Sequence, residues 1–146
     1  MGLFGKSKED KQEEWYNKGI ELFELGQYEE SVTCFDNSIQ LNPEDSDVWN
    51  NKSIALGVLE RYEESVTCCD KVIELNPEFS DAYTNKGNSL HSLGKYEEAI
   101  LCCDKAIHLN PEDSDAWYNK GDSLHSLGRD EEAEECIARA KKLEES

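Results

Sequence analysis

The chain has 146 residues, of which 37% are apolar and 33% charged, and its formal net charge at pH 7 is −18. Such a surface repels phosphate groups, which argues against direct binding to nucleic acid or to an anionic membrane and favours cationic partners. No segment approaches the roughly 18 consecutive apolar residues of a membrane span, and no signal-peptide core is recognisable. We therefore expect a cytoplasmic protein.

Residues 1–11, MGLFGKSKEDK, come before any periodic pattern, and we expect them to form a flexible N-terminal segment. They nearly fit an N-myristoylation signal, but Lys6 stands where that signal requires serine or threonine. Residues 12–146 are expected to form a single domain.

Four related motifs divide this domain. WYNKG, WNNKS, YTNKG and WYNKG begin at Trp15, Trp49, Tyr83 and Trp117, each 34 residues after the one before. A fixed period of this size is typical of stacked-repeat proteins. We assign the repeats to residues 12–45, 46–79, 80–113 and 114–146.

The third repeat illustrates the structure that we expect of each. Asp81 or the serine before it caps a first helix, and Gly94 ends that helix in a left-handed conformation. A second helix begins at Tyr96 with two glutamates in its first turn and ends before Pro111, since a residue that precedes proline leaves the α region. Neither helix pair can bury its apolar stripe alone, so the four pairs must stack.

The framework residues of this repeat are Tyr83, Gly87, Leu90, Gly94, Tyr96, Ala99, Cys103, Ala106 and Pro111. This framework, which recurs in register over about residues 12–145, resembles the tetratricopeptide repeat. The resemblance implies an all-α fold, a right-handed α-solenoid of antiparallel helix pairs. It also implies a non-enzymatic scaffold for protein interaction, with the first helix of each repeat lining a concave groove in which extended peptides commonly lie.

The second repeat departs from the framework. Ser53 and Glu60 replace its two glycines, and a left-handed conformation at Glu60 costs roughly 1 kcal/mol. Gly57 falls inside a predicted helix, where it leaves a notch that can admit a ligand side chain.

The fourth repeat carries polar residues where the others present apolar ones to a following repeat. Asp130 stands where the other repeats have tyrosine, Glu134 where they have valine or isoleucine, and Lys141 where they have isoleucine. These residues predict a solvated end of the array. Apolar residues that remain at this end, such as Leu143, could support self-association. The first alternative function is therefore a self-associating assembly module, which would form a homodimer.

Six cysteines occupy two adjacent positions of the repeat. They are Cys34, Cys68, Cys69, Cys102, Cys103 and Cys136. Equivalent positions of stacked helices lie roughly 8–10 Å apart, too far for a disulfide or a shared tetrahedral zinc. We predict that they pack as small apolar residues, and a thiol redox or metal sensor is the second alternative.

No constellation in the sequence indicates an enzyme. The glycines occur singly rather than in a phosphate-binding loop, and the serines have no histidine and aspartate partners in a recognisable pattern. His91 and His125 occupy equivalent positions of neighbouring helices and can share a metal only if both side chains lean together. We expect no catalytic residue, no metal and no cofactor.

By the resemblance, the positions after each aromatic residue carry recognition. One column consists of Asn17, Asn51, Asn85 and Asn119. An asparagine amide both donates and accepts hydrogen bonds, so a column at the repeat spacing can hold a peptide main chain. The alternative is that each asparagine bonds within its own helix or faces water.

A second column is acidic and consists of Glu13, Asp47, Asp81 and Asp115. These residues can meet lysine or arginine of a ligand, but acids are also favoured in the first turn of any helix. The variable positions of the groove are Ile20, Ile54, Asn88 and Asp122, and then Phe23, Gly57, His91 and His125. They make the groove apolar toward the N-terminus and polar toward the C-terminus. We therefore predict an extended or short helical peptide ligand with an apolar end and a basic end.

Some members of the family bind the acidic C-terminal tail of a heat-shock chaperone through a two-carboxylate clamp. The matching positions here are Tyr16, Ile20, Asn51, Asp81 and Asn85. Only Asn51 fits the clamp, and Asp81 would repel a carboxylate, so this ligand is not the leading prediction.

Overall fold

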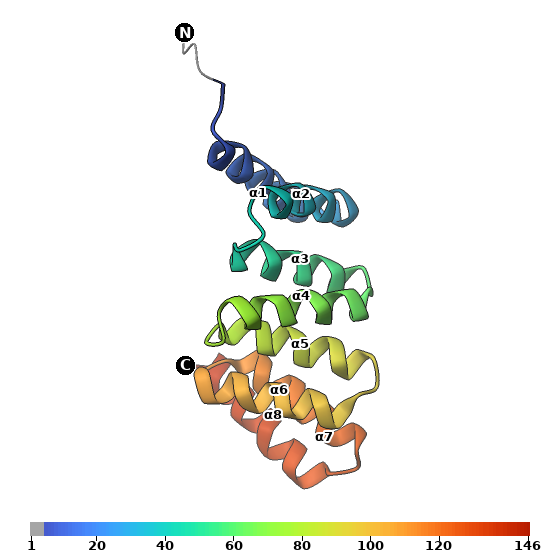
Figure 1. Ribbon diagram of the computed structural model, residues 1–146. Coiled ribbons are helices and arrows are strands. Elements are labelled where there is room, and N and C mark those ends of the chain that lie inside the picture. The colour runs from blue at the N-terminus through green and yellow to red at the C-terminus, as the bar shows by residue number, and fades with distance from the viewer. Residues whose placement is uncertain (1–4) are drawn as a thin grey trace.

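The computed structural model describes residues 5–146, and these residues form eight helices and no strand (Figure 1). The helices are α1 (Lys8–Glu24), α2 (Tyr28–Leu41), α3 (Ser46–Val58), α4 (Tyr62–Leu75), α5 (Ser80–Ser92), α6 (Tyr96–Leu109), α7 (Ser114–Ser126) and α8 (Asp130–Glu144). They stack as four helix pairs, from α1 and α2 at one end to α7 and α8 at the other. The prediction of an all-α solenoid is confirmed. None of the helices in the described chain has both the length and the apolar character needed to cross a membrane.

Two helix starts differ from the sequence analysis. Residues 1–11 were expected to form a flexible segment, but α1 begins within them, at Lys8. Ser7 and Asp10 form a capping box there, in which each side chain accepts a hydrogen bond of 3.0 Å from the other residue's backbone nitrogen. The expected cap of α5 at Ser80 or Asp81 is wrong, since its N-cap is Phe79, which provides no side-chain acceptor. Residues 1–4 of the predicted flexible segment lie outside the described residues.

The turns inside the repeats follow the predicted chemistry. Gly26, Gly94 and Gly128 have φ between 76° and 77°, in the left-handed region that glycine adopts readily. Glu60 occupies the same position in the second repeat with φ 60°. The backbone therefore holds its left-handed conformation there although the residue disfavours it.

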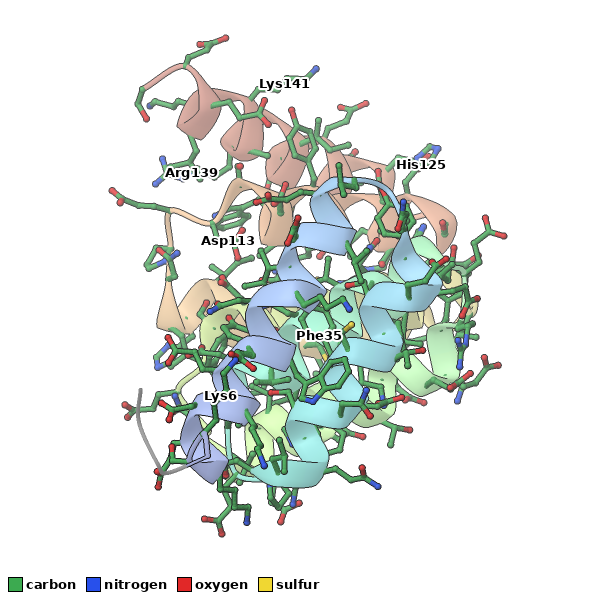
Figure 2. All side chains as sticks on the ribbon, turned by 90° about the horizontal axis from the view of Figure 1, so that it is seen from above. Lys6, Phe35, Asp113, His125, Arg139 and Lys141 are labelled. Carbon is green, nitrogen blue, oxygen red and sulfur yellow. The ribbon has the colours of Figure 1, made fainter. Side chains whose placement is uncertain are left out.

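Within a repeat the two helices pack closely at one glycine of the first helix. A Cβ added to Gly19 would lie 2.5 Å from Phe35, whose ring fills the space between α1 and α2 (Figure 2). Phe35, Leu56 and Leu124 are among the largest fully buried side chains of the described chain. The core thus runs along the stack between the helix pairs.

Between repeats, the second helix of one repeat packs against the first helix of the next, as in α2 with α3, α4 with α5 and α6 with α7. The first helices α1, α3, α5 and α7 also contact one another in sequence, whereas no such contact joins the second helices of the described chain. Helices that approach one another more closely lie on the inner side of a curved stack. The first helices therefore line the concave face, as expected.

Candidate functional site

An apolar hollow lies on the concave face between α1 and α3. It has a volume of about 210 Å³ and is lined by Ile20, Phe23, Glu24, Phe35, Asn51 and Ile54. Three apolar residues predicted for the groove, Ile20, Phe23 and Ile54, are thus brought together with one asparagine of the predicted column. Phe35 forms part of the wall because it passes between the two helices of the first repeat.

A second depression, the notch, lies one repeat further along, between α3 and α5. Its volume is about 300 Å³, and its lining includes Ile54, Gly57, Val58, Asn85 and Asn88. The nearest atom to a Cβ built on Gly57 is Ser65 Oγ, at 4.0 Å, so the missing side chain leaves open space. The structure thus contains the space that the sequence predicts at this glycine.

The asparagine column forms hydrogen bonds that the sequence analysis did not anticipate. Asn51 Nδ2 donates to the Tyr16 hydroxyl at 2.8 Å, and Asn85 Nδ2 donates to Asn50 Oδ1 at 3.1 Å. Both bonds join neighbouring repeats rather than atoms of one helix. Each of these amides retains a second N–H and its carbonyl oxygen as groups that a ligand can use.

The two end members of the column differ from the central pair. Asn17 is exposed and Asn119 is half-buried. Neither lines the apolar hollow or the notch. The structure therefore brings only the two central asparagines together with the hollows of the concave face.

The Tyr16 hydroxyl, which accepts the hydrogen bond from Asn51, lies near two carboxylates. Burial, together with the charges of Asp47 and Asp45, raises the pKa of its hydroxyl. The hydroxyl therefore stays protonated at neutral pH, and it can donate to a ligand carbonyl while it accepts from Asn51. Tyr16 was named in the sequence analysis only as a mismatch with the carboxylate clamp.

The predicted acidic column is exposed at all four positions, and three of its members, Asp47, Asp81 and Asp115, lie in the first turn of their helices. Glu13 lies further along its helix, because α1 already begins at Lys8. Within residues 5–146, none of the four forms an ion pair. Partial burial, with the charges of Asp113 and Asp115, raises the pKa of Asp81. The negative charges at this part of the face are mutually unfavourable, and a cation placed beside Asp81 relieves them.

The remaining predicted residues are not part of either hollow. His91 Nδ1 lies 3.0 Å from Ser123 Oγ, and its ring packs against Tyr96 at 5.3 Å between centroids. In the last repeat, His125 Nδ1 lies 2.7 Å from Asp130 Oδ1. Asp122 is exposed. These three polar residues, which were predicted for the C-terminal end of the groove, therefore line neither the apolar hollow nor the notch.

The six cysteines are free thiols, and all except Cys102 are buried. Burial raises the pKa of Cys69 and of Cys103 to about 12 and that of Cys68 to about 11. Thiols that stay protonated are poor nucleophiles and poor metal ligands. In the described part of the chain, no group of three or more histidine, cysteine, aspartate or glutamate side chains is placed to hold a metal ion.

The sequence analysis did not identify two residues of the site, Asn50 and Phe35, because their roles depend on contacts with other helices. Asn50 follows an aromatic residue of the framework, and its role as an acceptor depends on the neighbouring Asn85. Phe35 stands at the framework position of Cys103, two repeats earlier, yet it also lines the apolar hollow. A signal for Phe35 exists in the sequence, since Gly19 leaves room for a large ring at that level.

Family models match the chain over most of its length. Models described as "Tetratricopeptide repeat" match residues 13–45, 46–79, 80–113 and 102–135. The chain belongs to the tetratricopeptide repeat family. No curated protein matches it at the level of sequence. Membership of the family and the stacked fold together support a protein-interaction scaffold.

Solved structures resemble this chain over most of its length. MamA 41-end from Desulfovibrio magneticus RS-1 is 25% identical, with a TM-score of 0.84 over 92% of this chain and 76% of that one. The first TPR of Spaghetti (RPAP3), bound to the HSP90 peptide SRMEEVD, is 23% identical, with a TM-score of 0.79 over 87% of this chain and 99% of that one. The Arabidopsis OM64 TPR domain is 20% identical, with a TM-score of 0.79 over 82% and 98%. The last two likenesses concern the fold alone.

Proposed function

We propose that the chain is a non-enzymatic, cytoplasmic interaction module that binds a peptide segment of a partner protein along its concave face. The observation that carries this proposal is the apolar hollow, where Ile20, Phe23 and Ile54 meet beside Asn51. Binding sites are commonly apolar depressions with a few polar groups that are free to form hydrogen bonds with the ligand.

The size of the hollow favours a peptide side chain over a small-molecule ligand. Its volume of about 210 Å³ is below the roughly 300–1,000 Å³ of typical small-molecule sites. An isoleucine, leucine or phenylalanine side chain placed there would be surrounded by Phe23, Phe35 and Ile54. Such an apolar anchor in a pocket commonly provides much of the affinity of a peptide interface.

The neighbouring notch extends the site along the stack. Asn51 stands at the wall of the apolar hollow and Asn85 at the wall of the notch. A peptide that crosses both depressions passes these two amides in turn, and their free carbonyl and N–H groups can bond its main chain. The inter-repeat bonds hold both amides in place before the ligand arrives, which reduces the entropy that binding must overcome.

The negative charges of the concave face favour basic residues at the other end of the ligand. Asp81 and Asp115 form no ion pair within residues 5–146, and the net charge of the chain is −18. Lysine or arginine beside Asp81 is attracted both by that carboxylate and by the field of the whole molecule. We therefore assign an apolar residue to the hollow and basic residues to the part of the ligand that lies toward α5 and α7.

The acidic chaperone peptide in the Spaghetti (RPAP3) structure is not carried over to this chain. At the matching clamp positions Asp81 would repel a carboxylate of such a peptide, and the charges of Asp113 and Asp115 act at the same place. Like charges at these positions cost binding free energy, and no lysine or arginine replaces them at the matching clamp positions.

Isothermal titration calorimetry with designed peptides tests the proposal. A peptide with one phenylalanine followed by three lysines is compared with the same peptide carrying glutamates in place of the lysines. The basic peptide is expected to bind, and Phe23→Ala is expected to weaken it at least about tenfold. Leu101→Ala is the matched control, because Leu101 is a 69% exposed apolar residue on the second helix α6. Equal binding of the two peptides, or equal effects of the two variants, would contradict the proposal.

A further inference from the structure

The end of the stack formed by the first repeat presents an apolar surface that is separate from the groove. This end face is a shallow hollow of about 400 Å³ lined by Trp15, Lys18, Leu22, Thr33, Cys34 and Asn37, among others. Trp15 is 36% exposed, and it is one of the few large apolar side chains that the described chain leaves open to solvent.

The other three repeats show what covers the equivalent face. In each, the second helix of the preceding repeat packs on it and supplies an aspartate to the lysine of the first helix. The pairs are Lys52 with Asp36, Lys86 with Asp70 and Lys120 with Asp104. The last two have N–O distances of 2.6 Å.

A second hydrogen bond repeats at the same interface. Trp49 and Trp117 donate from Nε1 to the carbonyl oxygens of Pro43 and Pro111, at 2.8 and 2.9 Å. Tyr83 donates from its hydroxyl to the Pro77 carbonyl at 2.9 Å. Each covered face therefore receives three things from its neighbour: an apolar helix surface, an aspartate, and the carbonyl of the proline that follows the helix.

The first repeat has the receiving groups without these partners. Lys18 lies over the ring of Trp15, 5.6 Å from its centroid, as Lys52 does over Trp49, but no carboxylate of residues 5–146 pairs with it. No acceptor in the same residues takes the Trp15 Nε1–H, either. The end face thus carries one side of the interface that joins neighbouring repeats, without the helix that forms the other side.

We propose that this end face docks an amphipathic helix of a partner protein built like α2, α4 and α6. The partner helix places an aspartate against Lys18 and apolar residues against Trp15 and Leu22. The turn that follows it offers a main-chain carbonyl to the Trp15 indole. This binding mode involves none of the residues of the apolar hollow or the notch, so it does not depend on the proposed groove function.

A second copy of the chain does not supply that helix. In α8 the position of the three aspartates is Ala138, and Glu134 and Lys141 are exposed where α2, α4 and α6 carry apolar residues. Two end faces set against each other would bring two Lys18 side chains together, with no carboxylate matched to them as in the internal pairs. The complementarity therefore points to a different protein.

A peptide copied from α4 is the probe for this proposal. Residues 62–79 carry Asp70 and the proline turn, and α4 covers the equivalent face of α5. Cys68→Ala and Cys69→Ala remove the thiols. A lactam between Glu63 and a lysine introduced by Thr67→Lys, both at exposed positions, holds the helix, because a free peptide of this length is marginally helical. The peptide carries fluorescein at its N-terminus, and its binding to the full chain is measured by fluorescence anisotropy.

Charge exchange decides whether Lys18 receives the aspartate. Lys18→Asp is expected to weaken the complex at least about tenfold, and a peptide with Asp70→Lys is expected to restore it. Lys105→Asp makes the same change of net charge at an exposed position of α6 and should leave the dissociation constant within about twofold. Circular dichroism of each variant confirms that the fold is retained.

Three results would overturn the proposal. The first is an equal effect of Lys18→Asp and Lys105→Asp, or no rescue by the exchanged peptide. The second is competition between this probe and the basic groove peptide for one site. The third is a dimer in sedimentation velocity that Lys18→Asp dissociates, which would make a second copy the occupant. The first and third results leave open whether the groove binds its own ligand, and the chemical shifts of the groove peptide complex answer that question separately.

Discussion

Asn51 reaches across the boundary between the first two repeats and donates a hydrogen bond to the hydroxyl of Tyr16, 2.8 Å away. This bond fixes an amide at the wall of the apolar hollow, with its carbonyl oxygen still available. The same bond joins two repeats, so Asn51 contributes to the stack as well as to the proposed site.

Tyr16→Phe separates the two roles of Asn51. The variant removes the acceptor but leaves Asn51 in place, so the free energy of unfolding should fall by about 0.5–1.5 kcal/mol. Binding of the basic groove peptide should weaken by only about threefold, because Asn51 stays in place but is no longer held before the ligand arrives. Asn51→Ala combined with Asn85→Ala should weaken that binding at least about tenfold. Urea denaturation and calorimetry measure the two effects, and unchanged affinity in the double variant would rule out the role of the asparagines.

Gly57→Ala should raise stability and lower affinity together. Gly57 lies inside α3, and alanine there gains about 0.5–1 kcal/mol of helix stability without a clash, since the nearest atom is 4.0 Å from the new Cβ. The added methyl group begins to fill the notch, so the groove peptide should bind more weakly.

Gly87→Ala is the matched control in the next repeat. A Cβ there meets Cys103 Sγ at 2.8 Å and the Ala99 carbonyl oxygen at 3.3 Å, so stability should fall by about 1–3 kcal/mol. A gain of stability in this variant, or a loss in Gly57→Ala, would contradict the packing described here.

Glu60→Gly should stabilise the chain by about 1 kcal/mol. Glu60 holds φ 60°, a conformation that glycine adopts without the steric conflict of a Cβ. Gly94→Ala, at φ 76°, should lose a similar amount. Denaturant midpoints of the two variants should therefore move in opposite directions, and a shift of both in one direction would be inconsistent with backbone strain.

Asp81→Asn should raise stability at pH 7, by an amount that shrinks as the pH falls. Because the pKa of Asp81 is raised on folding, its carboxylate is less favourable in the folded chain than in the unfolded one. That penalty is fully present above the folded pKa and disappears as the carboxyl becomes protonated in both states. Thermal denaturation between pH 7 and about pH 4 measures the difference, which should also shrink at high salt. A difference independent of pH would contradict the assignment.

Cys102 should be the first thiol to react with a disulfide reagent under native conditions. It is the one cysteine of six that is not buried, although partial burial still raises its pKa. Cys102→Ser should remove the early phase of the reaction, whereas Cys69→Ser should leave it unchanged. An early phase that survives Cys102→Ser would indicate that another thiol becomes accessible through local opening.

Much of the fold follows from single positions of the sequence. The glycines before Gln27, Lys95 and Arg129 mark turns because a left-handed residue is needed there, and the motif spacing sets the number of helix pairs. The start of α1 was missed although Ser7 and Asp10 have the spacing of a capping box. That signal is short, and it lies before the first repeated motif.

The site was predicted less completely because its key contacts join residues far apart in the sequence. Ile20, Phe23 and Ile54 share the positions of a repeat, so their common face could be read from the period. The bond from Asn85 to Asn50 and the pairing of Lys86 with Asp70 depend on how far one repeat is turned against the next. The angle between neighbouring repeats cannot be derived from the 34-residue period of the sequence.

Backbone chemical-shift mapping tests the groove most directly. The 15N-labelled chain is titrated with the basic peptide that carries one phenylalanine. The account predicts that the largest shifts fall on α1, α3 and α5, at Ile20, Ile54 and Asn85, with little change at Leu101 on α6. Largest shifts on the second helices, or at Trp15 and Lys18 of the end face, would contradict a ligand site on the concave side of the stack.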